Sequence, residues 1–138
     1  AENLKILSLL NNTISDIKPI CNLTKLTYLD LSNNNLKDLS PLSSLYENIS
    51  YVYANNQEIH IEKTINPQNN IFTLPLDFMK DIDGSIITNV SPYNNGYYHS
   101  ENNCITWNLE CIPCEVNFDF SGINDIFSGT VYVKIKSE

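Results

Sequence analysis

One pattern of apolar and polar positions recurs every 22 residues in the first half of the chain. Residues 4–25 align with residues 26–47, and the conserved spacing includes the apolar pairs Leu4/Leu26, Leu7/Leu29, Leu9/Leu31, Ile14/Leu36, Ile17/Leu39, Ile20/Leu42 and Leu23/Leu45. A third copy begins after one extra residue, with Ile49, Val52, Ala54, Gln57 and Ile59 at equivalent positions. This period predicts stacked coils, because a single coil cannot bury its own apolar edge.

Each copy has the form LxxLxLxxN of a leucine-rich repeat. The alternation of Leu29 and Leu31 predicts a short strand whose leucine side chains point into the coil. Asn12 and Asn34 follow the strands, at a corner where a side-chain amide can satisfy turn backbone groups. Residues 16–19 and 38–41 have an Asp three positions before a proline, and this predicts a return that starts with a short 3₁₀ turn.

The second half of the chain follows a different pattern. From about Glu62 onward, short alternating runs are separated by turn residues, which is typical of a small all-β module. We expect strands over residues 105–109, 116–120 and 131–136, and shorter strands over 72–74 and 86–87 with a turn at 80–84. No segment has helical periodicity. The sequence therefore predicts a mainly β protein with leucine-rich repeats over residues 1–60 and a β-sandwich over residues 61–138.

This combination resembles the internalin family of bacterial surface proteins. The resemblance rests on the repeats with their DIxPL-type returns, the junction YANNQEI at 53–59, the strand ITWNL at 105–109 and the segment FSGTV at 127–131. It implies an immunoglobulin-like domain fused without a linker to the last repeat. It also implies a secreted or wall-attached adhesion or invasion protein whose concave repeat surface binds a host protein. The chain departs from the family in having about two and a half repeats, and in the cysteines of its β-module.

Side chains between the inward leucines point outward from the repeats and form three columns. The columns are Ile6, Tyr28 and Tyr51; Ser8, Asp30 and Tyr53; and Leu10, Ser32 and Asn55. We call the set Tyr28, Asp30, Ser32, Tyr51, Tyr53 and Asn55 the strand face, the concave side of such a solenoid. Tyrosine buries a large area at low entropic cost, so this set is a candidate protein-binding surface. Alternatively, Tyr51 and Tyr53 pack where the β-module docks.

The open edge of the last repeat gives the β-module a structural role. An exposed strand edge with apolar side chains is an aggregation hazard, and a module whose sheet joins that edge removes it. We therefore expect residues 61–138 to serve mainly as a cap and spacer. We also expect further repeats and a capping unit before Leu4. This gives an alternative function for the chain, namely a structural cap and spacer, with the binding surface of the protein on those N-terminal repeats.

Composition excludes several classes of function. The formal charge is −8, the pI is about 4.6, and all eight basic residues are lysines. Nucleic-acid binding is disfavoured because the phosphate backbone is repelled and no arginine fork is available. No apolar run approaches the roughly 20 residues of a membrane span. No signal peptide is recognisable, so we expect either a processed leader or an excerpt of a longer chain.

The cysteines leave alternatives open. Cys111 and Cys114 form a CxxC, which is compatible with a redox pair, with half of a zinc site completed by His99 and Cys104, with a loop disulfide or with free thiols. A zinc site is disfavoured because Cys104 lies about 15–20 Å away along a strand. A redox role is disfavoured because no helix follows. A disulfide is favoured outside the cell, and Cys21 is expected to be unpaired.

Catalytic patterns are not found. Residues 81–84 read as an Asp-Gly turn and not as a calcium loop, because Met79 and Val90 occupy positions that need acids. His60 and His99 lie in no nucleophile motif, and Glu58 and Glu62 read as solvated charges. The predicted function is non-catalytic recognition of a host or surface protein through the strand face, without a cofactor, at the bacterial surface or outside the cell.

Overall fold

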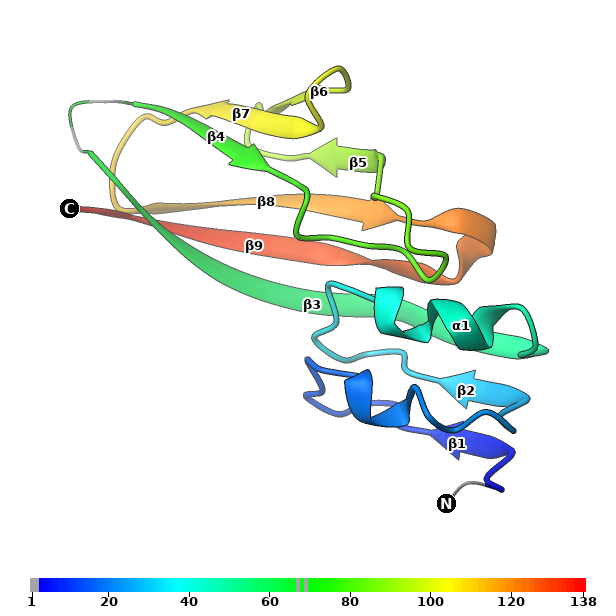
Figure 1. The fold of residues 1–138 in the computed structure, drawn as a ribbon. Coiled ribbons are helices and arrows are strands. Elements are labelled where there is room, and N and C mark those ends of the chain that lie inside the picture. Colours follow the sequence, from blue (N-terminus) through cyan, green and yellow to red (C-terminus); the bar gives the residue numbers. More distant parts are fainter. Residues whose placement is uncertain (1–2, 67, 69) are drawn as a thin grey trace.

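The computed structural model describes residues 3–66, 68 and 70–138, and they form a mainly β structure (Figure 1). The strands are β1 Ile6–Ser8, β2 Tyr28–Asp30, β3 Tyr51–Ile65, β4 Ile71–Pro75, β5 Asn89–Pro92, β6 Tyr97–His99, β7 Cys104–Asn108, β8 Cys114–Ser121 and β9 Phe127–Ser137. The helices are the one-turn α1 Ser43–Tyr46 and the 3₁₀ helices η1 Lys18–Ile20, η2 Ser40–Leu42 and η3 Ile123–Asp125. In the described residues, no helix has the length and apolar character that a membrane crossing requires.

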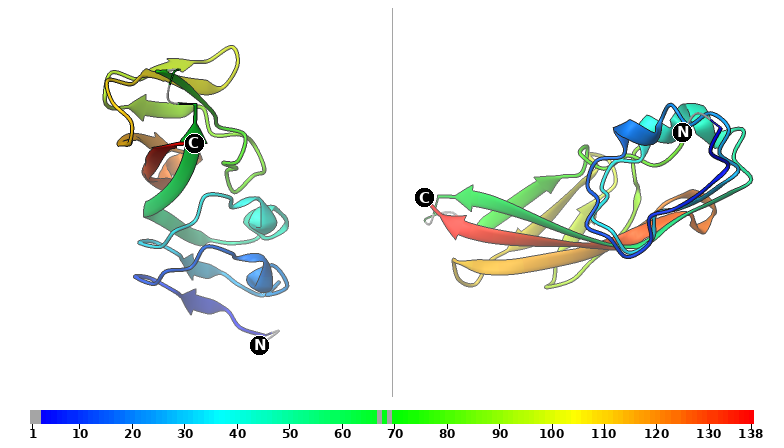
Figure 2. Two further views of the ribbon diagram at one scale, coloured as in Figure 1. Left: turned by 90° about the vertical axis from the view of Figure 1, so that its left-hand side faces the viewer. Right: turned by 90° about the horizontal axis from the view of Figure 1, so that it is seen from below.

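The repeats form stacked coils that share one apolar interior, as the 22-residue period predicts. Strands β1, β2 and the start of β3 are parallel, and their register places Leu7, Leu29 and Val52 side by side. The coils superimpose when the molecule is viewed along the stack (Figure 2, right). Buried leucines from both the strands and the returns meet between them, including Leu29, Leu31, Leu36, Leu39 and Leu42.

The returns begin as predicted, with a 3₁₀ turn that contains proline. Pro19 lies in η1 and Pro41 in η2. Asp16 Oδ1 accepts a hydrogen bond from the Lys18 amide at 3.0 Å, and Asp38 Oδ1 accepts one from the Ser40 amide at 2.9 Å. The repeated Asp therefore satisfies the amide that precedes each proline.

A ladder of side-chain amides holds the coils together at the corner. Asn34 is 2% exposed; its Nδ2 donates to the carbonyls of Leu9 and Leu31, both at 2.9 Å, and its Oδ1 accepts from the Ile14 amide. Gln57 takes this role in the third copy, since its Nε2 also donates to Leu31 O at 3.0 Å. The predicted function of the repeated Asn is confirmed, because these bonds satisfy buried backbone groups within a coil and between coils.

Strand β3 joins the repeats to the module. The first residues of β3 form the third parallel strand of the repeats. Because the strand is 15 residues long, it continues past residue 60 into the module. Along most of its length β3 also pairs in parallel with β9, from Ala54 opposite Phe127 to Ile65 opposite Ser137. The result is one six-stranded sheet in the order β1-β2-β3-β9-β8-β5, which supplies the expected cover for the edge of the last repeat.

The ladder between β3 and β9 is irregular where the two parts meet. The register shifts between Ala54 and Gln57, and Gly129 faces this bulge. A Cβ on Gly129 would lie 2.3 Å from the Gln57 carbonyl oxygen, a distance that no side chain can occupy. Only glycine lets β9 approach this closely.

A second contact joins the module to the return side of the repeats. The Leu39 amide donates to Lys80 O at 2.9 Å, and the Lys80 amide donates to Lys37 O at 3.2 Å. The next residue, Asp81, is buried and accepts a 2.8 Å hydrogen bond from the Ile123 amide through Oδ2. The turn after β4 therefore connects the repeat to the loop that precedes β9.

The module itself is two packed sheets. The second sheet has the order β4-β7-β6, and it lies across the module's core from β9, β8 and β5 (Figure 1). Trp107 from β7 is fully buried, stacks on Phe72 with ring centroids 6.0 Å apart, and donates from Nε1 to Tyr93 O at 2.8 Å. Trp107 also lies against Phe118 of β8, with ring centroids 6.4 Å apart, so large side chains from both sheets fill the sandwich that the alternating runs predict.

Two local expectations are wrong. Residues 86–87 do not form a strand: the pairing is limited to one isolated bridge between Ile86 and Lys80, and Ile87 does not extend it. The turn expected over residues 80–84 is present, and the Gly84 amide donates a hydrogen bond to Asp81 O. The expectation of no helix fails at α1, where buried Leu42 and Leu45 are spaced for a single turn, too short to show a helical period.

The amide ladder gives the first prediction. Replacing Asn34 by Ala removes four hydrogen bonds and leaves the Ile14 amide without its side-chain acceptor, so we expect a loss of about 2–3 kcal/mol in unfolding free energy. The matched variant Asn12→Ala removes two exposed bonds and should cost less than about 1 kcal/mol. Urea denaturation of both variants measures the difference, and equal losses would contradict the buried ladder.

The bulge gives the second prediction. Gly129→Ala places a methyl group against the Gln57 carbonyl, and we expect it to destabilise the chain by about 1–3 kcal/mol through overpacking. Ser137→Ala, at the exposed far end of the same strand, is the control and should change stability by less than about 0.5 kcal/mol. Thermal and urea unfolding test this. An unchanged unfolding midpoint for Gly129→Ala would show that the backbone at the bulge can move to accommodate the methyl group.

Candidate functional site

The strand face is built by the parallel register of three short strands. Ile6, Tyr28 and Tyr51 are cross-strand neighbours, and so are Ser8, Asp30 and Tyr53. Side chains in each column lie on the sheet surface opposite the buried leucines, because successive residues of a strand alternate between faces. The strand register therefore forms the first two columns that the repeat spacing predicts.

Three tyrosine rings gather on this face. Tyr28 on β2 is half-buried against two rings of β3, with ring centroids 6.4 Å from Tyr51 and 6.0 Å from Tyr53, the second pair edge-to-face. Tyr51 is 59% exposed and Tyr53 is 40% exposed. Tyr51 and Tyr53 thus contact Tyr28 while both remain exposed to solvent, and such a group offers a large rigid contact area.

The polar members of the strand face are held by local hydrogen bonds. Asp30 Oδ1 accepts from the Ser32 amide at 3.0 Å, and Ser32 Oγ accepts from the Asn55 amide at 3.1 Å. Asn55 Oδ1 accepts from Ser128 Oγ, on β9 of the module, at 3.1 Å. The third column is therefore bound both across the repeats and to the module.

A cavity of about 280 Å³ lies where Tyr51 and Tyr53 approach the loop before β9. Its lining includes Tyr46 and Asn124, and Asn124 Nδ2 donates to Tyr46 Oη at 3.0 Å. The strand face thus ends in a hollow shared between the last repeat and η3.

The outer face of the sheet continues onto the module with a second aromatic contact. His60 stacks on Tyr132 with ring centroids 5.0 Å apart, and its Nε2 lies 3.2 Å from Glu58 Oε2. Sequence reasoning missed Tyr132, although the alternation of Val131 and Val133 inward implies that it points outward. Glu62 pairs with Lys136 at 2.9 Å, and that hydrogen bond and charge lower the pKa of Glu62.

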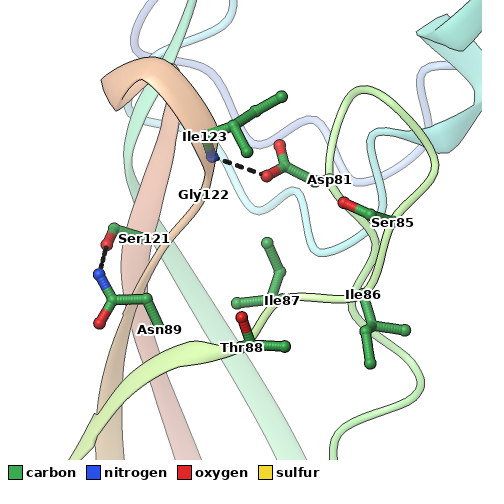
Figure 3. A pocket seen from close by; sticks show the side chains of 9 residues that line it. All are labelled: Asp81, Ser85, Ile86, Ile87, Thr88, Asn89, Ser121, Gly122 and Ile123. Atoms are coloured by element: carbon green, nitrogen blue, oxygen red, sulfur yellow. Dashed lines mark hydrogen bonds between the residues drawn. The ribbon is translucent and has the colours of Figure 1, made fainter.

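A cavity of about 430 Å³ lies between the turn that contains Asp81 and the end of β8 (Figure 3). Its carboxylate, Asp81, is engaged by backbone amides of Ile82 and Ile123, and Asn89 Nδ2 donates to Ser121 Oγ at 2.7 Å. Asp81 is buried and no His or Cys lines the described cavity, so its polar groups hold the turn in place. Nothing there is arranged for acid–base or nucleophilic chemistry.

The cysteines are all free thiols. Cys21 is unpaired, as expected, and Cys104 is buried at the start of β7. Cys104 pairs across the sheet with His99, whereas Cys111 lies past the opposite end of β7, so the structure does not bring the four candidate zinc ligands together. Across the part of the chain that the structure describes, no three His, Cys, Asp or Glu residues are grouped to hold a metal ion.

Comparisons with known proteins support the repeat assignment. The family model described as "Leucine Rich repeats (2 copies)" matches residues 2–44. No curated protein matches the chain.

Several solved structures share the fold. The functional domain of InlJ from Listeria monocytogenes, whose description includes a cysteine ladder, is similar with a TM-score of 0.76 and 25% identity; the match covers 90% of this chain and 27% of that one. The CBM51-2 and INT domains of ZmpB from Clostridium perfringens, in complex with GlcNAc, match with a TM-score of 0.69 and 20% identity, over 96% of this chain and 29% of that one.

The secreted internalin-like protein Lmo2445 from Listeria monocytogenes matches with a TM-score of 0.54 and 17% identity, over 98% of this chain and 52% of that one. The chain thus spans between about a quarter and a half of the length of these structures. The two matches below 25% identity show the fold alone. Together with the repeat match they confirm the predicted fold class, a short leucine-rich solenoid fused to a β-sandwich.

The exposure of the tyrosines gives a stability prediction. Because Tyr51 is mostly open to solvent, Tyr51→Ala should change the unfolding free energy by less than about 1 kcal/mol. Val52→Ala, the adjacent inward residue, should cost about 1–2 kcal/mol through the loss of buried methyl groups. Thermal denaturation compares them, and a greater loss for Tyr51→Ala would mean that this ring serves packing.

Proposed function

We propose that this internalin-like leucine-rich repeat chain is a non-catalytic protein-binding module of a bacterial surface or secreted protein, with the strand face as its contact surface. The observation that carries the proposal is the cluster of half-buried Tyr28 with exposed Tyr51 and Tyr53 on two adjacent strands, β2 and β3. Exposed aromatic residues that gather on one rigid face are enriched in protein interfaces.

The rigidity of the face supports a binding role. The tyrosines project from paired strands, and Ser32 and Asn55 beside them are fixed by hydrogen bonds. A partner would therefore bind side chains that are already ordered, and the entropy lost on association would be small.

The charge of the face supports a partner with a basic surface. The chain carries −8, and among the described residues Lys136–Glu62 is the one ion pair between a lysine and a carboxylate. Asp30 lies beside the tyrosine cluster, and Glu58 lies further along β3. Lysine or arginine side chains of a partner would meet these carboxylates and the faces of the tyrosine rings.

The β-module has a supporting role in the proposal. We infer that residues 61–138 form an immunoglobulin-like cap domain that ends the repeats and presents them, while residues 1–60 bind. Support comes from β9, which pairs with the edge of β3, and from Lys80, which holds the return of the second repeat.

A second candidate function places the main binding surface on further N-terminal repeats; the internalin-like structures that match this chain are longer than it is. The exposed apolar side chain of Leu4 favours it, because Leu26 at the equivalent position of the next repeat is buried. Another coil stacked on β1 would cover Leu4, as the first coil covers Leu26.

The test is binding of the purified chain to an array of recombinant extracellular host proteins, followed by titration of each protein that binds. The double variant Tyr51→Ala/Tyr53→Ala should weaken Kd at least about tenfold, because aromatic anchors at an interface contribute about 2 kcal/mol or more. The unfolding free energy of the variant is measured in parallel.

The matched control is Tyr97→Ala. Tyr97 is a 67% exposed tyrosine on the module's smaller sheet, away from the strand face, and its loss should leave Kd unchanged. Equal weakening by Tyr97→Ala, or full binding by the double variant, would contradict the proposed surface. If only a fragment with more N-terminal repeats bound the same protein, the second candidate function would be supported.

A further inference from the structure

The CxxC segment has no part in the proposed binding function, yet its two thiols are placed together. Residues 110–113 bend between β7 and β8, and Cys114 is the first residue of β8, opposite Ile135 near the end of β9. This turn lies close to the C-terminus at the end of the module away from the repeats (Figure 1). Chemistry at this turn can therefore proceed without disturbing the strand face.

Cys111 and Cys114 line one cavity of about 270 Å³, together with Asn94, Asn95 and Glu110 among others. Cys111 is exposed and Cys114 is half-buried. Burial raises the pKa of Cys114, and the charge of Cys111 raises it further. Two cysteines separated by two residues in a bend can be bridged without unfolding the strands on either side.

We propose that Cys111 and Cys114 form a thiol–disulfide exchange site that accepts low-molecular-mass disulfides, such as glutathione disulfide, from the cavity they share. The Cys111 thiolate attacks one sulfur of the small disulfide, forms a mixed disulfide and releases one small thiolate. The Cys114 thiolate then attacks the Cys111 sulfur, and the second small thiolate leaves. The two protein thiols lose two electrons and two protons, and one small disulfide becomes two thiols.

The exposure of the two sulfur atoms sets the order of these steps. The nucleophile is the thiolate, and only Cys111 is exposed to a dissolved disulfide. The raised pKa of Cys114 lowers its thiolate fraction near neutral pH, so the resolving step should accelerate as pH rises. Cys114 attacks a sulfur atom already held beside it, which compensates for its low thiolate fraction.

The two other cysteines cannot replace either member. Cys104 is buried at the opposite end of β7, and Cys21 lies in the return of the first repeat. The exchange is thus confined to one turn, and it is independent of whether the strand face binds a protein.

The experiment treats the reduced, folded chain with glutathione disulfide and follows intact mass and peptide maps with time. The expected product has lost two hydrogen atoms, with the bond mapped between Cys111 and Cys114. The variant Cys114→Ser should stop at a stable adduct of one glutathione on Cys111. The variant Cys111→Ser should lose the rapid reaction, while Cys21→Ser, the matched control, should react as the parent does.

Other outcomes would overturn the proposal. These are a pair that stays reduced in excess glutathione disulfide, a bond that includes Cys21 or Cys104, or an adduct that forms on Cys114 before Cys111. Circular dichroism shows that each variant is folded before it is used. A loss of array binding by the tyrosine variants, with exchange intact, separates this site from the proposed binding function.

Discussion

The fold depends on one constraint: the last coil of the repeats presents a strand that must be paired on both edges. Strand β3 meets it by lying parallel to β2 on one side and to β9 on the other. Its inward side chains pass from the repeat interior, at Val52 and Ala54, to the core of the module at Ile59. Pairing the edge buries apolar surface and satisfies strand amides and carbonyls in a single step, which is why the two parts cannot be separated by a linker.

The same constraint explains the features around the joint. The two ladders on β3 have different registers, so the strand bulges between Ala54 and Gln57 and β9 needs Gly129 opposite the bulge. Gln57 lies just after the bulge, and its long side chain still donates a hydrogen bond to Leu31 O. The shorter side chain of Asn would reach this carbonyl only if the backbone lay closer to it. On the return side, Lys80 and Asp81 link the repeat to the loop before β9. Rigid attachment on both sides holds Tyr51 and Tyr53 in one orientation relative to the module, a property that a recognition surface requires.

Much of this could be predicted from single residues. Leu29 and Leu31 predict the strand and its inward face, Pro41 predicts the 3₁₀ turn, and Asn34 predicts the buried corner, because each depends on local geometry that a 22-residue period repeats. The strand prediction at 86–87 was wrong, since apolar residues in a row do not show whether a partner strand lies alongside, and here the pairing stops after the bridge of Ile86 to Lys80. The single turn of α1 was missed because two apolar residues do not make a period. Tyr132 was missed as a partner of His60, since their contact is made between strands far apart in the chain.

The sequence by itself determined the repeat, its apolar interior, the outward columns and the change to a sandwich, because alternation and period are properties of neighbouring residues. Only the tertiary structure decided that β9 pairs with β3 and that Asp81 holds the loop before it. Those contacts join segments that are distant in sequence. Their partners are selected by which edges and buried polar groups remain unsatisfied once the local elements have formed.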